Sequence, residues 1–167
     1  MNLPKITLLN RMDAVQYKPK GKAVAVRLDD QYPLRDLKGS YLDVLVQTFK
    51  DTEDISDYSI TNDNAKDIVE FVKKHSKIDE IVVHCHHRQG RSPAVALAIE
   101  EHFKIKNIDI REFPNINKLV LSKVRSAFKG ELRAENTVGG IKESKNEKEV
   151  SAPEKLSFIE IIKSMFS

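Results

Sequence analysis

Residues 81–104 read IVVHCHHRQGRSPAVALAIEEHFK and carry the clearest structural pattern in the chain. Ile81, Val82 and Val83 form an apolar, β-branched run, which predicts a buried strand. A second apolar run, rich in Ala, Leu and Ile, begins at Pro93 and predicts a buried helix with proline at its favoured first position. The stretch therefore predicts a strand, a loop and a helix in direct succession.

The loop between this strand and this helix has the chemistry of an anion site. A helix N-terminus directs main-chain N–H groups and the positive end of the helix dipole at one point, which suits a phosphate dianion. Arg91 stands at the helix start, where its planar guanidinium can bind two phosphate oxygens at once. Cys85 stands at the other end of the loop, and cysteines in such surroundings have pKa values of roughly 3.5–7.5 in place of about 8.5. We therefore expect Cys85 to act as a nucleophile towards bound phosphate.

The motif HC-x5-RS at residues 84–92 resembles the phosphate-binding loop of cysteine-dependent protein tyrosine and dual-specificity phosphatases, in their compact bacterial or phage-like form. Gly90 and the RSPAVA sequence after it fit this family well. Most of its members place glycine three residues after the cysteine, where this chain has Arg88. The resemblance covers residues 5–128. It implies hydrolysis of phosphate monoesters, on phosphotyrosine and also on phosphoserine or phosphothreonine, through a cysteinyl-phosphate and without a metal or cofactor.

The resemblance also implies roles for the residues of the loop. Cys85 attacks phosphorus, Arg91 holds the phosphate oxygens, and Ser92 donates its hydroxyl to the sulfur when the thiolate leaves. His84 is expected to be buried and to orient Cys85. Substrate is expected to be bound by the residues between the strand and the helix, which are His86, His87, Arg88, Gln89, Gly90 and Arg91.

A general acid must protonate the leaving oxygen, and in the resembling family it is an aspartate on the loop after the preceding strand. Asp51 directly follows a predicted strand, 34 positions before Cys85 (85 − 51), and is the first candidate. Asp54, in the same acidic loop, is the second, because spacing alone does not separate the two.

The segment REFPNINKL at residues 111–119 also resembles a region of the compact phosphatases. In that region an asparagine before the final helix braces the active-site loops. The resemblance carries this role to Asn115. Asn115 and Asn117 are both also well suited to cap a helix, which is the simpler interpretation of either residue.

Length and composition limit the class of protein. The chain has 167 residues, enough for one domain with its own core and a tail. A hydrophobic content of 40% and a charged content of 32% are typical of a soluble globular protein, and a net charge of +3 neither requires nor excludes nucleic acid. Cys85 is the only cysteine, so no internal disulfide can form and a reducing, cytoplasmic setting is expected. We expect no secretory leader and no transmembrane segment, which would need ~20 apolar residues.

Apolar segments of strand and helix character alternate over residues 5–128. Strands are predicted at 5–9, 22–28, 41–49 and 78–83, and helices at 62–75, from 93 onwards and at 118–128, with a short helix or turn at 12–17. Strands as apolar as these are usually buried on both faces. The predicted fold class is therefore α/β, with a mostly parallel central sheet flanked by helices on both faces.

The composition changes after the last predicted core helix. Residues 1–129 are predicted to form the catalytic domain, and residues 130–153 a charged flexible linker with few aliphatic side chains. Residues 154–167 are predicted to form an amphipathic helix, because Leu156, Ile159, Ile162 and Phe166 have helical spacing. That helix could dock on its own domain, on a partner or on a membrane surface.

Several alternatives to a protein phosphatase stay open at this point. A catalytically silent module would bind phosphorylated partners through the same loop. The positive rim of His86, His87 and Arg88 would suit a more highly charged substrate, such as a phosphoinositide or an RNA 5′-end, or it could simply face solvent. A rhodanese-type sulfurtransferase also uses one cysteine in a loop before a helix, but Ser92 and the upstream aspartate favour phosphate. Metal binding by the histidines and cysteine of this loop is disfavoured, because adjacent ligands give poor tetrahedral geometry.

Overall fold

The computed structural model of the chain describes residues 3–29 and 34–132. These residues belong to one compact unit, Met1–Glu135, and so cover nearly all of the predicted catalytic domain. The predicted linker beyond residue 132 and the predicted C-terminal helix at 154–167 lie outside the described residues. Within the described part of the chain, no helix is long and apolar enough to cross a bilayer.

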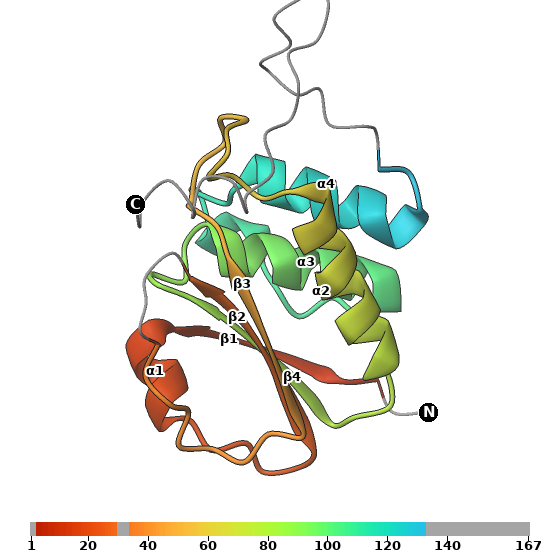
Figure 1. Cartoon of the computed structure of the whole chain (residues 1–167). Helices are drawn as coiled ribbons and strands as arrows, with labels where there is room; N and C mark the ends of the chain where they lie inside the picture. Colours follow the sequence, from red (N-terminus) through yellow and green to blue (C-terminus); the bar gives the residue numbers. More distant parts are fainter. Residues whose placement is uncertain (1–2, 30–33, 133–167) are drawn as a thin grey trace, which may run out of the picture. The chain divides into compact units, whose positions relative to one another are not determined.

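A four-stranded sheet forms the centre of this unit (Figure 1). Its strands are β1 (Lys5–Asn10), β2 (Ala23–Asp29), β3 (Asp43–Thr48) and β4 (Glu80–Cys85), in the spatial order β1-β4-β2-β3. Every neighbouring pair is parallel. The strand that ends in Cys85 therefore lies inside the sheet, between β1 and β2, and the carboxyl ends of all four strands meet at one edge.

Helices cover both faces of the sheet, which confirms the predicted α/β class (Figure 1). Three of them lie on one face: α2 (Asn62–Lys74), α3 (Arg91–Phe103) and α4 (Lys118–Lys129). The short helix α1 (Arg11–Gln16) lies on the other face and buries Ala14 and Val15. A 3₁₀ turn, η1 (Ile110–Glu112), precedes α4.

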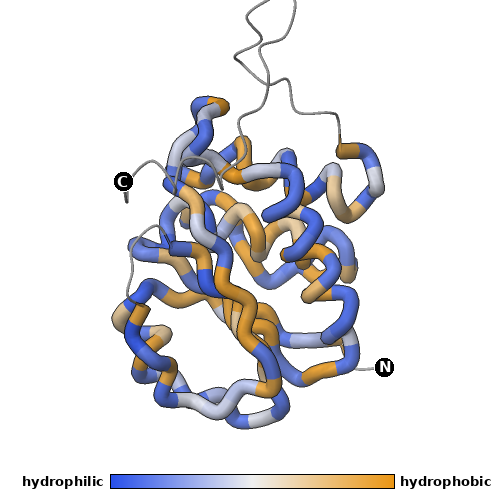
Figure 2. The backbone as a smooth tube through the Cα atoms, in the orientation of Figure 1, coloured by the Kyte–Doolittle hydropathy of each residue, from blue (hydrophilic) through white to orange (hydrophobic). Residues whose placement is uncertain are grey.

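Alternation along the strands supplies both faces of the core. Val26 of β2 and Val83 of β4 belong to the large apolar cluster with α2, α3 and α4. Their neighbours Ala25 and Val82, which point to the other face, are also fully buried. The long hydrophobic stretches of these strands stand out in Figure 2. Burial of a strand on both faces explains why its sequence is apolar almost throughout.

The strand β3 differs from the expectation that every strand is buried on both faces. Val44 and Val46 are 39% and 37% exposed, whereas Gln47 is buried. The reason is position, because β3 is the last strand of the sheet and only one of its faces is covered, by α2. Gln47 makes that contact by donating to Asp67 of α2 at 3.0 Å.

The start of α3 also differs from the sequence prediction. The helix begins at Arg91 with Gly90 as its N-cap residue, so Pro93 is the third helical residue and not the first. Proline is tolerated at this position because the first four N–H groups of a helix have no partner within the helix. The earlier start places Arg91 and Ser92 inside the first turn.

Candidate active site

Cys85 is the last residue of β4, and residues 86–90 connect it to α3 at the carboxyl edge of the sheet. Its side chain is buried, and its Sγ atom lies 3.1 Å from the Oγ atom of Ser92 in the first turn of α3. Ser92 is fully buried, so its hydroxyl is held against the sulfur. The structure therefore brings together the expected nucleophile and the hydroxyl expected to assist it.

The N-terminus of α3 is open to an anion. Its N-cap residue, Gly90, has no side chain to accept a hydrogen bond, and no acidic residue lies in the first turn. The first-turn N–H groups and the positive end of the dipole therefore have no side-chain acceptor from the cap. Such an arrangement suits a phosphate.

Arg91 joins the candidate phosphate-binding loop to the end of β3. Its side chain is only 3% exposed, and its Nη1 donates to the main-chain oxygen of Phe49 at 2.7 Å. Its Nε lies 4.0 Å from Oδ2 of Asp51. A guanidinium anchored in this way keeps its planar group in one orientation, which favours recognition of phosphate oxygens.

Asp51 lies directly against the loop. A Cβ atom at residue 90 would come within 2.2 Å of Oδ2 and 2.5 Å of Oδ1 of Asp51, so only glycine at position 90 allows this approach. The Asp51 side chain is 41% exposed and therefore reaches both the loop and solvent. Asp54 is exposed, and its carboxylate makes no hydrogen bond or ion pair with the described residues. Of the two candidate acids, the structure places Asp51 at the loop.

The N-terminus of α4 anchors the loop that carries Asp51. The Asn117 side chain donates from Nδ2 to Oδ1 of Asp51 at 2.8 Å and to the main-chain oxygen of Thr52 at 3.1 Å. The N–H of Lys118 donates to Oε1 of Glu53 at 2.8 Å. Three consecutive residues of the acidic loop are thus bonded to the N-cap residue and the first residue of α4, which fixes the carboxylate of Asp51 beside Arg91.

The bracing role expected of Asn115 belongs to Asn117. Asn115 is exposed and makes no hydrogen bond with the described residues, whereas Asn117 is buried. Asn117 caps α4 by accepting from Val120 N–H at 2.9 Å, and its own N–H donates to the Gly90 oxygen at 3.2 Å. The role lies two residues later than expected because α4 starts at Lys118. Asn117 is therefore the residue that contacts both the acidic loop and Gly90 of the candidate phosphate-binding loop.

On the expectation that Asp51 is the general acid of a phosphatase, replacing Asn117 by serine should lower kcat/KM for phosphate monoesters about 10-fold or more, because Asp51 is no longer held in position. Serine is also a good N-cap residue, so the cap of α4 is kept, but the two hydrogen bonds that Asn117 donates to the acidic loop are lost, which should lower the free energy of unfolding by about 1–3 kcal/mol. Steady-state kinetics and denaturant unfolding measure the two quantities separately.

Asn115→Ser is the matched control for this variant and should leave both quantities unchanged. Equal activity of the two serine variants would contradict the bracing role of Asn117.

The rim of the loop is positive and faces solvent. His87, Arg88 and Gln89 are exposed, and the ring of His86 meets that of His87 edge-on at 4.1 Å between centroids. Arg88 has a φ of 60°, in the left-handed region, which glycine adopts more readily than a residue with a side chain. Its guanidinium lies 5.7 Å from the ring centre of Phe113, beside the turn before α4.

His84 lies fully buried on the face of the sheet opposite to Cys85, as expected of a residue one position earlier in a strand. Its Nε2 accepts a hydrogen bond from Nε of Arg27 at 3.2 Å. Burial, followed by the nearby charge of Arg27, lowers the pKa of His84 to about 4. The imidazole is therefore neutral at physiological pH.

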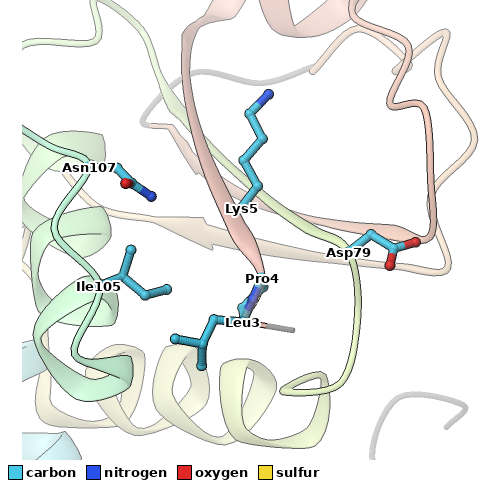
Figure 3. Close-up of a pocket in the computed structure, with 6 residues that line it drawn as sticks. All are labelled: Leu3, Pro4, Lys5, Asp79, Ile105 and Asn107. Atoms are coloured by element: carbon cyan, nitrogen blue, oxygen red, sulfur yellow. The ribbon is translucent and has the colours of Figure 1, made fainter. Parts of the chain in front are cut away.

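A separate open pocket lies at the opposite edge of the sheet (Figure 3). It is lined by Leu3, Pro4, Lys5, Asp79, Ile105 and Asn107. Lys5 begins β1 and pairs with Glu80, at the end of β4 remote from Cys85. This pocket is therefore not part of the candidate active site.

The fold and the site together define an α/β protein with a buried cysteine, serine and arginine at the carboxyl edge of a parallel sheet. Over residues 3–29 and 34–132, no group of three or more histidine, cysteine, aspartate or glutamate side chains could hold a metal ion. No protein-family model matches the chain, and no curated protein matches it significantly. Function must therefore be inferred from the residues of the site.

Proposed function

We propose that the protein is a cysteine-dependent phosphatase that hydrolyses phosphate monoesters through a cysteinyl-phosphate, with phosphorylated proteins as substrates. The main support is one set of contacts at the start of α3. Cys85 Sγ lies 3.1 Å from Ser92, and Arg91 lies 4.0 Å from Asp51. Such a reaction needs a nucleophile, a group that binds the phosphate, an acid for the leaving oxygen and a hydrogen-bond donor to the departing thiolate.

In the first step the thiolate of Cys85 attacks phosphorus and a sulfur–phosphorus bond forms. The bond from phosphorus to the ester oxygen breaks, and Asp51 gives its proton to that oxygen, so the alcohol or phenol leaves neutral. Arg91 and the main-chain N–H groups of residues 86–91 bind the other three phosphate oxygens, whose charge must be stabilised in the transition state.

In the second step water attacks phosphorus, and the carboxylate of Asp51 accepts its proton. The sulfur–phosphorus bond breaks, and inorganic phosphate and the Cys85 thiolate are regenerated. The Ser92 hydroxyl, 3.1 Å from the sulfur, donates a hydrogen bond to the departing thiolate. The cycle needs no second cysteine, but the free thiol needs a reducing compartment such as the cytoplasm.

The charges around the site favour a protein substrate over a polyphosphorylated one. The acidic loop carries four carboxylates, at Asp51, Glu53, Asp54 and Asp57, and the first of them lies against Gly90 of the candidate phosphate-binding loop. They would oppose a substrate with several phosphates. The same loop exposes Ile55 (72%) and Tyr58 (65%), and it carries a hydrophobic tip in Figure 2. These side chains offer apolar contacts to a peptide that flanks the phosphorylated residue.

Replacing Asp51 by asparagine tests the acid. We expect kcat for a phosphotyrosine peptide to fall about 10²–10³-fold, within the range of general acid catalysis. The loss should be smaller for para-nitrophenyl phosphate, because nitrophenolate leaves readily without a proton. Steady-state rates for both substrates between pH 5 and pH 9 measure these effects.

Asp54→Asn is the matched control, since it removes one carboxylate from the same loop. Its rates and its pH profile should resemble those of the wild type. A large loss of kcat in Asp54→Asn together with an unchanged kcat in Asp51→Asn would reverse the assignment.

A silent phosphate-binding module is the principal alternative. It predicts that the wild-type protein turns over no phosphate ester, although phosphate or vanadate binds and the binding is lost in Arg91→Lys. Turnover that requires Cys85 excludes this alternative.

A further inference from the structure

The two most exposed large hydrophobic side chains among the residues that the structure describes lie in one loop. They are Ile55 and Tyr58, in the acidic loop between β3 and α2. The next two residues, Ser59 and Ile60, are buried, so the exposure is confined to the outer part of the loop. In Figure 1 this loop projects beyond the carboxyl edge of the sheet. Single exposed apolar side chains are common, but two with this exposure in one projecting loop indicate a contact surface.

The base of the loop holds Tyr58 beside the candidate acid. The N–H of Lys50 donates to the main-chain oxygen of Tyr58 at 2.7 Å, so Tyr58 lies beside the residue that precedes Asp51. The Lys50 ammonium lies 4.3 Å from the centre of the Tyr58 ring, which favours one orientation of the ring. Ile55 is four residues after Asp51, so their Cα atoms are at most about 14 Å apart. Both apolar side chains therefore lie within the length of a short peptide from Asp51.

Asp57 adds a negative charge between the two apolar side chains in the sequence. It is exposed, and its carboxylate makes no hydrogen bond or ion pair with the described residues. Such a carboxylate is available to a lysine or arginine of another molecule. Residues 50–58 carry one lysine and four carboxylates, a net charge of −3 (1 − 4). The charge of the loop therefore favours a positively charged partner.

We propose that Ile55 and Tyr58 bind an apolar side chain of the substrate and that Asp57 binds a lysine or arginine close to it. The inference rests on the proposed function and names its class of substrate, a phosphorylated peptide segment with an apolar and a basic residue beside the phosphorylated one. In that reaction Asp51 must come within hydrogen-bond distance of the ester oxygen, so the substrate chain passes beside the acidic loop. The loop is already hydrogen-bonded to the N-terminus of α4, so binding does not require the loop to be ordered first.

Two phosphotyrosine peptides of equal length test this specificity. The first carries leucine and arginine next to the phosphotyrosine, and the second carries serine at the same positions. The readout is the preference, which is kcat/KM for the first peptide divided by kcat/KM for the second. A general change in catalysis affects both values and cancels in the ratio. The wild-type protein should prefer the first peptide by at least about 10-fold.

Three substitutions separate the apolar contact from the charge. Ile55→Ser combined with Tyr58→Ser should lower the preference about 10-fold, the effect of losing the central apolar contact of a small interface. Asp57→Asn should lower it about threefold at low salt and less at high salt, because an exposed ion pair contributes little and is screened. All three side chains are exposed, so the variants should fold, which circular dichroism checks.

The matched controls change similar side chains outside the acidic loop. Leu42→Ser removes a hydrophobic side chain that is 63% exposed, and Asp63→Asn removes a carboxylate that is 87% exposed in the first turn of α2. Both controls should keep the preference of the wild type. A loss of preference in the controls equal to that in the loop variants would contradict a specific docking surface.

Equal kcat/KM for the two peptides in the wild type, or a preference that survives in all loop variants, would overturn the inference. A preference that rises in the double variant would also overturn it, because the apolar pair would then contact this chain itself or a second copy. Failure of the phosphatase proposal would appear differently, as absent turnover of every ester by the wild type. Fluorescence anisotropy of labelled peptides on full-length Cys85→Ser tests docking without turnover and should show the same preference.

Discussion

Hydrolysis of para-nitrophenyl phosphate is expected to fall at least about 10⁴-fold when Cys85 is replaced by serine, because a covalent step is lost with its nucleophile. The serine hydroxyl is far less acidic than a thiol, so the field of the loop cannot ionise it at neutral pH. The change is nearly isosteric at a site that is 1% exposed, so the fold should be retained. Initial rates in reductant measure the loss.

Phosphate binding is the control for Cys85→Ser. In the proposed site the anion is held by Arg91 and the N-terminus of α3, neither of which is altered, so inorganic phosphate should still inhibit or bind the variant. Residual hydrolysis above about one hundredth of the wild-type rate, a loss well short of that for a missing nucleophile, would contradict the role of Cys85.

Replacing Arg91 by lysine is the second change with a large expected effect, a loss of about 10³-fold in kcat/KM or about 4 kcal/mol. Lysine keeps the positive charge but has no planar group to bind two oxygens, and it cannot at the same time reproduce the 2.7 Å bond from Nη1 to the Phe49 oxygen. Both kcat and KM should worsen, because the proposed role of Arg91 is to bind phosphate both before and during the transition state. Saturation kinetics separate the two.

Arg111→Lys provides a control for Arg91→Lys, since Arg111 is an exposed arginine paired with Asp109 in the turn before α4. Its kinetics should be unchanged. Comparable losses in both variants would indicate a general effect of removing arginine and would contradict a specific phosphate contact at Arg91.

Most of the fold could be predicted because local pattern and global structure agree along this chain. The apolar runs at Ile81–Val83 and from Pro93 onwards lie in the strand β4 and the helix α3, and both elements are buried along most of their length. Edge effects could not be predicted in the same way. Val44 and Val46 are exposed because β3 is the last strand of the sheet. The order of the strands depends on tertiary packing, so the sequence of β3 by itself does not show that it lies at the edge.

The candidate site shows the same difference between residues that are close in the sequence and residues that are far apart in it. Cys85, Arg91 and Ser92 lie within one loop and one helical turn, so their spacing alone brings them together. Contacts across long separations were missed or misplaced. Asn117 meets Asp51 over 66 positions, and Arg27 meets His84 over 57, because each pair depends on how elements dock. The suitability of Asn117 as a helix cap was the one local signal, and it did not distinguish Asn117 from Asn115.

The decisive experiment for the proposed covalent mechanism is to trap a phosphorylated Cys85. Ser92→Ala removes the hydroxyl 3.1 Å from the sulfur, so the thiolate should leave more slowly and the intermediate should accumulate. The variant is mixed with para-nitrophenyl phosphate, quenched in acid and digested, and its peptides are analysed by mass spectrometry. We predict one added phosphoryl group on the peptide that contains Cys85, and none in Cys85→Ser. Continued turnover by wild type and variant, with Cys85 unmodified throughout, would contradict a cysteinyl-phosphate mechanism.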